Sequence, residues 1–336
     1  MEEFAAVSGI SRPTLSKYFN DPDSVRPSTR QRVEAALKAH DFRPNIFAVN
    51  QNRRMTRNIG IVVPYLADPF FAELARQLET LVIDAGFRPI LLSSHGEPEQ
   101  EIDNLDSLRT IKPAGVLLAP LGLGSDRDQI EAFGQDVPTV HFDSNIPGLG
   151  DVFVGHNSDQ SIELMVDYLT RTGEPPVFFE MSTPTNPNAD QRRIAYVRAM
   201  ERRNLAPEFV RVEGRDWNFE EIGYQGGLKV IGRHGLPSST VLCSNDRLAI
   251  GLLAAAYEAG LRVGRGPGHA LRIAGHDDHP FSRFTCPPLT TITQDYAGIA
   301  RRAFECLFHL INQDNRHTGA RSEVLLDGDL ILRMSA

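Results

Sequence analysis

Hydrophobic positions are spaced differently on the two sides of Asn58. Before it, small and apolar residues such as Phe4, Ala5 and Ser8 recur at intervals that place their side chains on one face of a helix. After it, short apolar runs typical of strands alternate with longer segments of helical periodicity. The pattern predicts a small helical head followed by a large α/β body.

The head is predicted to hold three short helices. Gly9 would take the turn after the first helix, because a residue without Cβ adopts positive φ at little cost. Ser11 is a suitable N-cap for the second helix, and Pro13 is tolerated in its first turn, where a backbone amide has no partner within the helix. A turn at residues 20–24 leads to a third helix, predicted over residues 29–40.

The second helix has an inner and an outer face. We expect Ile10 and Leu15 to pack against the first helix, which leaves Arg12, Ser16 and Lys17 outward. Side chains of this kind suit a DNA groove, where Arg reads guanine and Lys reads a base or holds a phosphate. Within residues 1–58 there are 10 Lys and Arg against 6 Asp and Glu, a net charge of +4, whereas the remainder has 25 against 37, a net of -12. A basic head on an acidic body fits a head that meets phosphate.

The body contains two series of strands separated by helices. Such alternation gives parallel sheets covered on both faces, and two series predict two lobes. The predicted strands are residues 59–63, 89–92, 115–119 and 139–142, then 177–180, 210–212, 241–243 and 271–274. The predicted helices include residues 69–85, 158–172, 191–204, 219–234 and 246–260.

Composition excludes several classes of protein. No apolar run approaches the roughly 18 residues of a membrane span, and the N-terminus lacks a signal peptide, so we expect a cytoplasmic protein that meets no membrane. Cys243, Cys286 and Cys306 are too few and too far apart for a disulfide framework or a zinc knuckle, so we expect them to be reduced.

Ligands of two-lobed α/β proteins bind beyond the carboxyl ends of the strands. Phe70 and Phe71 follow the first predicted strand of the body and would either stack on a ligand ring or pack inside the lobe. Asp143 and Asp277 each follow a strand, and their carboxylates can accept protons from vicinal hydroxyls of a sugar.

The run from His276 to His279 also allows a metal reading, since His-x-x-His with carboxylates is a possible ligand set. A junction between strand and loop would splay these side chains, so we expect no metal and no cofactor. We also find no Walker loop, no GxSxG motif and no paired nucleophile and base, so an enzyme ranks last.

The motifs in their order resemble the lac repressor (LacI/GalR) family of bacterial transcription regulators. The matching runs are AAVSGISRPTLSKYFN at residues 5–20, VRPSTRQRVEAAL at 25–37 and FRPN at 42–45, and the resemblance extends over essentially the whole chain. It implies a helix-turn-helix head at residues 1–42, a hinge at 43–58 and a type I periplasmic-binding-protein-like core at 59–336 with two parallel doubly wound sheets. The implied N-lobe comprises residues 59–156 and 287–318, and the C-lobe residues 157–286 and 319–336.

The resemblance also implies a hinge helix that forms when two protomers sit on an operator. In the family a leucine of this helix enters the minor groove and kinks it. Aligning Pro44, Asn45 and Ala48 places Gln51 at that position, where it can donate and accept hydrogen bonds but makes a poor wedge. A disordered tether is the alternative. Residues that relatives place just before the motif are absent at Met1, so we expect a start further upstream or a weakly binding head.

The resemblance adds further site residues. Arg192 matches an arginine-x-x-glycine-aromatic pattern in which Ala195 replaces the glycine, and Asn245 would face the ligand while Asp246 caps the helix beside it. The DNA-binding residues expected are Arg12, Pro13, Thr14, Ser16, Lys17, Ser24, Arg30, Asn45, Ala48 and Gln51. The effector-binding residues expected are Asp68, Phe70, Phe71, Asp143, Asn186, Asn188, Arg192, Trp217, Asn245, Asp277, Gln294 and Tyr296.

Taken together, these features favour an effector-controlled transcription regulator, most simply a repressor. A homodimer would place two recognition helices on a near-palindromic operator, and a sugar or polyol would bind between the lobes. The chain has no leucine heptad after the core, so a dimer is expected rather than a tetramer. A transporter's solute-binding protein is the alternative, which the basic head and the missing signal peptide oppose.

Overall fold

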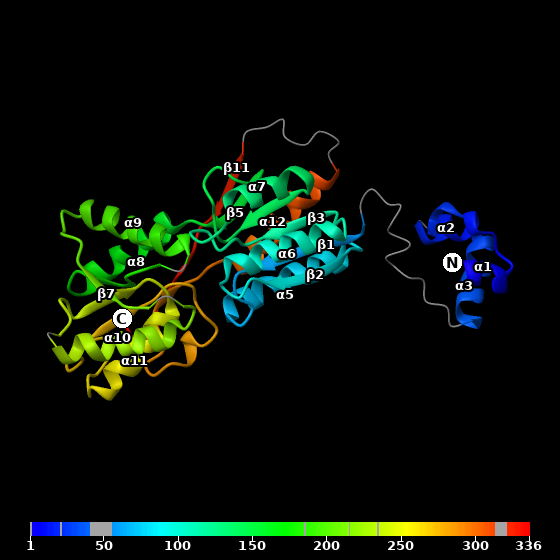
Figure 1. The fold of residues 1–336 in the computed structure, drawn as a ribbon. Coiled ribbons are helices and arrows are strands. Elements are labelled where there is room, and N and C mark those ends of the chain that lie inside the picture. Colours follow the sequence, from blue (N-terminus) through cyan, green and yellow to red (C-terminus); the bar gives the residue numbers. More distant parts are fainter. Residues whose placement is uncertain are drawn as a thin grey trace.

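The computed structural model describes residues 2–20, 22–40, 56–184, 186–214, 216–233, 235–312 and 321–336. The expected hinge residues Asn45, Ala48 and Gln51 lie outside this part of the chain. Within it, a helical head is followed by two α/β lobes (Figure 1), so the expected fold class is confirmed.

The head packs three helices around a small apolar core. Phe4, Ile10, Leu15 and Val33 form this core, and each is at most 3% exposed. The inward positions of Ile10 and Leu15 are as predicted. The elements are α1 (Glu2–Ser8), α2 (Arg12–Asn20), the 3₁₀ turn η1 (Pro22–Ser24) and α3 (Pro27–Ala39).

Helix α3 begins two residues earlier than the sequence pattern indicated. Arg26 is its N-cap in extended conformation, and Pro27 occupies the first turn, which the fixed φ of proline suits. The turn before α2 was predicted correctly, since Gly9 adopts a φ of +63°.

The first lobe is built on a six-stranded parallel sheet with the order β11-β5-β4-β3-β1-β2. Helices α5 and α12 cover one face, and α6 and α7 cover the other. Its central strands are buried because both faces are covered. The strands are β1 (Asn58–Val63), β2 (Arg88–Ser93), β3 (Gly115–Leu118), β4 (Thr139–Phe142), β5 (Val152–His156) and β11 (Ser322–Leu326). The helices are α5 (Pro69–Asp84), α6 (Pro98–Thr110), α7 (Arg127–Asp136) and α12 (Tyr296–Asn312).

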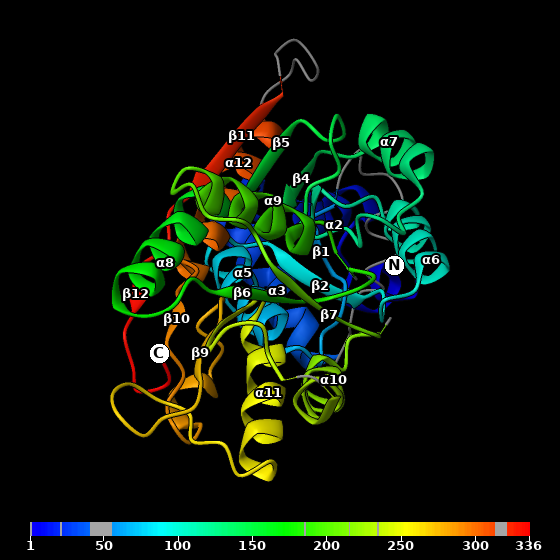
Figure 2. The same cartoon turned by 90° about the vertical axis from the view of Figure 1, so that its left-hand side faces the viewer.

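The second lobe repeats this plan with a four-stranded parallel sheet of order β7-β6-β8-β9. Helices α8 and α9 pack on one face, and α10 and α11 lie side by side on the other (Figures 1 and 2). Its strands are β6 (Val177–Met181), β7 (Phe209–Val212), β8 (Thr240–Cys243) and β9 (Arg272–Ala274). Its helices are α8 (Ser158–Thr172), α9 (Pro187–Glu201), α10 (Phe219–Arg233), α11 (Asp246–Glu258) and the short η2 (Ser282–Phe284).

The chain crosses between the lobes three times. It leaves β5 at His156 to enter α8, passes from β10 (Thr291–Ile292) to α12, and runs from β11 to β12 (Leu330–Ile331), which pairs with β10.

The expected division of the lobes was wrong at two of these crossings. Strand β11 pairs with β5 in the first lobe, with Ser322 opposite Val152, although residues 319–336 were assigned to the second. The segment before β10 stays with the second lobe, because Gly275 N donates to Thr290 O, so that crossing lies after Cys286. Both differences arise from pairings between segments far apart in the chain.

No helix in the described parts of the chain combines the length and the apolar character that crossing a bilayer requires.

Candidate functional site

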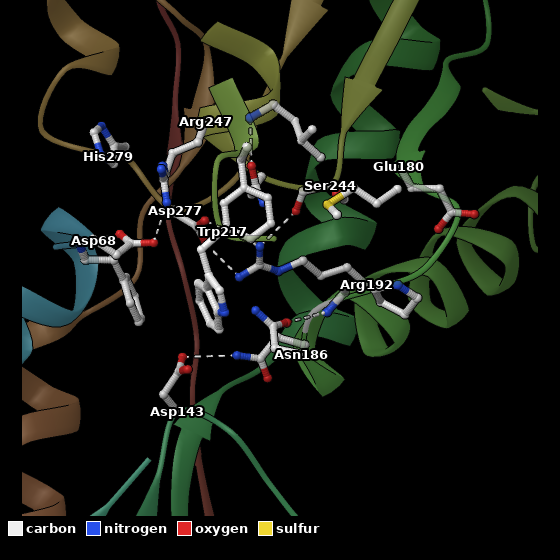
Figure 3. Close-up of a pocket in the computed structure, with 18 of the residues that line it drawn as sticks. Asp68, Asp143, Glu180, Asn186, Arg192, Trp217, Ser244, Arg247, Asp277 and His279 are labelled. Atoms are coloured by element: carbon white, nitrogen blue, oxygen red, sulfur yellow. Dashed lines mark hydrogen bonds and ion pairs between the residues drawn. The ribbon is translucent and has the colours of Figure 1, made fainter. Parts of the chain in front are cut away.

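A cleft lies between the lobes at the carboxyl ends of their strands, as expected for this architecture. Loops after β1 and β4 supply its first-lobe side, and loops after β6, β7, β8 and β9 supply the second (Figure 3). It is lined by Asp68, Phe70, Phe71, Asp143, Glu180, Met181, Pro184, Asn186, Asn188, Ala189, Arg192, Trp217, Phe219, Ser244, Asn245, Arg247, Leu248, Asp277, His279 and Gln294.

An ion pair between Arg192 and Asp277 occupies the centre of the second-lobe side. Arg192 Nη2 lies 2.6 Å from Asp277 Oδ1, and its Nη1 donates to Ser244 O at 2.8 Å. Gln294 Nε2 donates to the same Asp277 oxygen at 2.6 Å. Burial would raise the pKa of Asp277, but the Arg192 guanidinium and the His276 and Gln294 contacts hold it below its usual range.

Asp143 faces Asp277 from the first lobe in a different environment. Asn188 Nδ2 donates to Asp143 Oδ1 at 3.1 Å, and the side chain is otherwise enclosed. Burial raises the pKa of Asp143 to about 7 despite the favourable charge of Arg192. Asp143 has a φ of 59° and Asp277 a φ of 121°, a left-handed backbone that such residues adopt mainly where function or packing imposes it.

Aromatic rings form the remaining wall. Trp217 stacks on Tyr65 with centroids 5.9 Å apart, and it meets the edge of Phe71 at the same distance. Phe70 and Phe71 line the cleft while being only 8% and 3% exposed. These phenylalanines were expected either to stack on a ligand or to pack inside the lobe. Both rings line the cleft and are also packed at the start of α5.

Asn186 and Asn188 reach the cleft because α9 begins four residues earlier than predicted. Asn186 is the N-cap of α9 and accepts from Ala189 N at 3.1 Å, with Pro187 in the first turn. This start puts Asn188 and Arg192 on the first turns of α9, where both line the cleft.

Asn245 lines the cleft as expected, but it also takes the capping role expected of Asp246. Asn245 is the N-cap of α11 and accepts from Leu248 N at 2.8 Å, although it also lines the cleft. Asp246 is fully buried and accepts from His279 N, Ser282 Oγ and Thr291 Oγ1 at 2.8, 2.5 and 2.6 Å. It anchors the loop after β9, a contact that local capping patterns do not reveal.

Tyr296 also differs from expectation, since it is not among the residues that line the cleft. Its hydroxyl donates to Asp277 O at 2.6 Å, and its ring meets Phe70 with centroids 5.3 Å apart. It supports Asp277 and Phe70 from behind.

Arg247 and Glu180 line the cleft but were not predicted there, and His279 was considered only as a possible metal ligand. Arg247 Nη1 donates to Asp68 Oδ2 at 2.9 Å across the cleft. Glu180 lies next to the last residue of β6 and accepts from Arg211 Nε at 3.0 Å. Their positions in the sequence were the only signal, because Glu180 lies at the carboxyl end of β6, and Arg247 and His279 come a few residues after β8 and β9.

Several buried polar atoms of the cleft have no hydrogen-bond partner within the described residues. They are Arg192 Nε, Gln294 Oε1 and His279 Nε2. His279 Nδ1 accepts from Phe281 N at 3.3 Å, which leaves the ring proton on Nε2. The cleft therefore offers two donors and one acceptor beside the Asp143 carboxyl. The described residues contain no cluster of three or more His, Cys, Asp or Glu arranged for a metal.

The head presents its expected polar residues on α2 and beyond. Arg12, Pro13 and Lys17 are exposed, whereas Leu15 on the same helix is fully buried. Thr14 and Ser16 are half-buried, with Thr14 Oγ1 2.8 Å from Ser11 Oγ.

The expected residues outside α2 make contacts within the head. Ser24 Oγ donates to Lys17 O at 3.4 Å, and Arg30 forms an exposed ion pair with Glu34 at 2.9 Å.

Comparisons with known proteins cover both parts of the chain. Residues 1–45 match the family model of bacterial regulatory proteins, lacI family, and residues 166–336 match a periplasmic binding protein-like domain. The chain is 27% identical to the HTH-type transcriptional repressor PurR of Mannheimia succiniciproducens, with 100% of the chain and 98% of the relative covered. It is 28% identical to the ribose operon repressor of Escherichia coli over 93% of both. A crystal structure of the lac repressor dimer bound to operator and the anti-inducer ONPF superimposes with a TM-score of 0.81, at 23% identity, over 99% and 97% of the two chains.

Proposed function

The chain belongs to the lacI family of bacterial regulatory proteins, and from this premise we propose that it is a sequence-specific transcription regulator, acting as a repressor under the control of a small molecule. The observation that carries the proposal is one polypeptide with both an exposed Arg12 and Lys17 on α2 and a polar cleft between two lobes. The relatives named repressors support the same role.

The head is proposed to read DNA through α2. Leu15 anchors this helix in the head, so that Arg12 and Lys17 can enter a major groove. Arg12 is the base reader, with guanine as its usual partner, and Lys17 holds a phosphate or reads a base. Further contacts to the DNA sugar-phosphate backbone are supplied by Thr14, Ser16, Ser24 and Arg30. Pro13 has no hydrogen-bond donor, so it recognises the shape of the DNA groove.

The effector is proposed to be a sugar or polyol. A hydroxyl both donates and accepts, so adjacent hydroxyls satisfy Gln294 Oε1 and Arg192 Nε together, and a further hydroxyl donates to Asp143. The rings of Phe70, Phe71 and Trp217 would cover the apolar face of the sugar.

The charges at the cleft favour an effector without a phosphate or carboxylate. Arg192 is paired with Asp277, and Arg247 is paired with both Asp68 and Glu220. An anionic effector would therefore compete with carboxylates already bound to each guanidinium, and it would approach Asp143 as well. A neutral polyol meets neither obstacle.

Control is proposed to run through lobe closure. An effector that binds both lobes favours the closed arrangement, and in a homodimer this changes the spacing of the two heads on a near-palindromic operator. Whether the effector releases or promotes DNA binding depends on the sign of this coupling.

Two measurements test the proposal. Selection from random duplexes with the purified protein should enrich a near-palindrome, and Arg12→Ala should lose that enrichment. A thermal-shift screen should begin with ribose, given the name of the Escherichia coli relative, and continue through pentoses, hexoses and polyols. A ligand at about 100 times its dissociation constant adds roughly 2.7 kcal/mol of stability. Recovery of unrelated duplexes, or stabilisation that survives Asp277→Ala, would contradict the proposal.

A further inference from the structure

An ion pair crosses the cleft at one edge and joins the two lobes directly. Arg247, in the first turn of α11, places Nη1 2.9 Å from Oδ2 of Asp68, the residue before α5 (Figure 3). Asp68 is buried, with its side chain 6% exposed, and Arg247 is mostly enclosed, with its side chain 13% exposed. Solvent and salt therefore screen this contact far less than the ion pairs on the surface.

A second carboxylate holds Arg247 from its own lobe. Glu220, in the first turn of α10, accepts from Arg247 Nε at 2.7 Å and from Nη2 at 2.6 Å. This two-point contact leaves Nη1 for Asp68 and fixes the plane of the guanidinium. The guanidinium also lies over the ring of Phe219, 5.0 Å from its centroid.

The packing of α10 against α11 brings Glu220 and Arg247 together. A Cβ at Gly251 would lie 2.1 Å from Glu220 O, and a Cβ at Gly223 would lie 2.4 Å from Leu248 O. Only glycine permits backbones to approach this closely. The contact between Glu220 and Arg247 is therefore built into the second lobe and does not depend on the first.

Asp68 is fixed just as firmly in the first lobe. Its Oδ1 accepts from Phe70 N at 2.9 Å and caps α5, so only Oδ2 faces Arg247. Each lobe thus presents one oriented half of the ion pair.

From this geometry we propose that the ion pair between Arg247 and Asp68 sets the closure of the cleft, and that Glu220 is a positioning residue that keeps Arg247 aimed at Asp68. Glu220 already restricts the Arg247 side chain when the lobes are apart. Arg247 therefore loses little further conformational entropy when the lobes close. An effector then acts on an equilibrium that the protein's own side chains already bias. The inference does not depend on the proposed effector or operator.

The only tryptophan of the chain reports closure without any label. Trp217 belongs to the second lobe, yet it stacks on Tyr65 and meets Phe71 of the first lobe and is 8% exposed. Separation of the lobes would remove both first-lobe rings and admit water to the indole. Its emission would move to longer wavelength, and acrylamide would quench it more strongly.

The test compares three substitutions in the full chain without added ligand. Asp68→Asn keeps an oxygen to cap α5 but removes the charge, and Arg247→Met keeps an apolar stem without the guanidinium. Both should shift Trp217 emission to longer wavelength and raise the acrylamide quenching constant. Glu220→Gln retains one acceptor, so its shift should be in the same direction and smaller.

Asp159→Asn is the matched control. Asp159 pairs with Arg198 at 3.1 Å between α8 and α9, entirely within the second lobe, so its loss should leave Trp217 unchanged. Circular dichroism identifies any variant that fails to fold, and small-angle X-ray scattering measures lobe separation independently.

Unchanged quenching and scattering in both Asp68→Asn and Arg247→Met would overturn the role of the ion pair. A Glu220→Gln variant identical to the original protein would overturn the positioning role alone. An equal response in Asp159→Asn would show that any lost surface charge moves Trp217, and would overturn both. DNA selection and the effector screen are separate measurements, so their failure would leave this inference standing.

Discussion

Asn188 and Asp143 belong to opposite lobes and meet across the cleft, with Asn188 Nδ2 3.1 Å from Asp143 Oδ1. The amide contributes no charge, so the buried carboxyl of Asp143 depends on Arg192 further away for electrostatic support. Asp277 has the opposite arrangement, because a guanidinium, an amide and an imidazole all contact it. Two aspartates that face one cleft therefore differ in their preferred protonation states.

The raised pKa of Asp143 predicts a specific pH dependence. Burial puts its folded pKa at about 7, above the value of about 3.9 for an unfolded chain. Between these values the folded state binds a proton that the unfolded state releases, so the Asp143 contribution to stability falls as pH rises. Relative to Asp143→Asn, the original protein should lose at most about 1.4 kcal/mol per pH unit from pH 5 to 7.

Urea denaturation of both proteins at several pH values measures this difference. Other buried groups with shifted pKa values, such as Asp246, His156 and His276, are common to both proteins and cancel. A stability difference that is flat from pH 5 to 8 would disprove the prediction.

Loss of Arg192 should destabilise the second lobe. The Arg192 side chain is 8% exposed and that of Asp277 is 17% exposed, so Arg192→Met leaves a largely enclosed carboxylate without its cation. The expected cost is about 3 to 5 kcal/mol, and the double substitution with Asp277→Asn should cost less than the two single changes added together. Denaturant titrations of the four proteins provide the cycle, and additive costs would show that the ion pair carries no coupling.

The lowered pKa of Asp277 predicts where acid acts on this pair. The folded pKa is depressed, so its contribution to stability is present above the unfolded value of about 3.9 and disappears as pH falls below it. In Arg192→Met the decrease in stability on acidification should be smaller than in the original protein. Thermal midpoints measured between pH 5 and 3 test this, and an identical loss in both proteins would count against it.

The close contact of α10 and α11 predicts opposite effects for two glycines. Gly251→Ala would press a methyl group against the backbone of α10 and should cost about 3 kcal/mol or more. Gly232→Ala, on α10 with open space around its Cβ, should stabilise by about 0.5 to 1 kcal/mol. The urea unfolding midpoints of the two variants measure these changes in stability. Equal effects of the two substitutions would refute the close approach of α10 to α11.

The outer face of α2 predicts two kinds of DNA-binding defect. Arg12→Ala should cost about 1 to 3 kcal/mol on the selected operator and much less on random DNA. Lys17→Ala, if it holds a phosphate, should weaken binding to both equally and lower the salt slope by about 1. Fluorescence anisotropy at several salt concentrations separates the two, and equal losses for Arg12→Ala on both DNAs would remove its base-reading role.

The sequence by itself determined many of the elements, although it did not indicate β5, β10, β11 or β12, and it placed the candidate site at the carboxyl ends of the strands. Strand β4 and helix α8 have the predicted bounds, because periodicity and capping act within a few residues. Asp143 and Asp277 were expected at the cleft because the carboxyl ends of parallel strands share one edge, and Trp217 was expected there from the family resemblance.

Only the tertiary structure decided how those side chains pair. Asp68 and Arg247 are separated by 179 residues, and their contact requires that α10 pack on α11 and that the two lobes meet. The buried contacts of Asp246, which was expected to cap α11, depend in the same way on the loop after β9. Strand β11 joins the first lobe through its register with β5. Local patterns cannot specify such contacts, since their energy comes from burial and charge between segments that only the complete fold brings together.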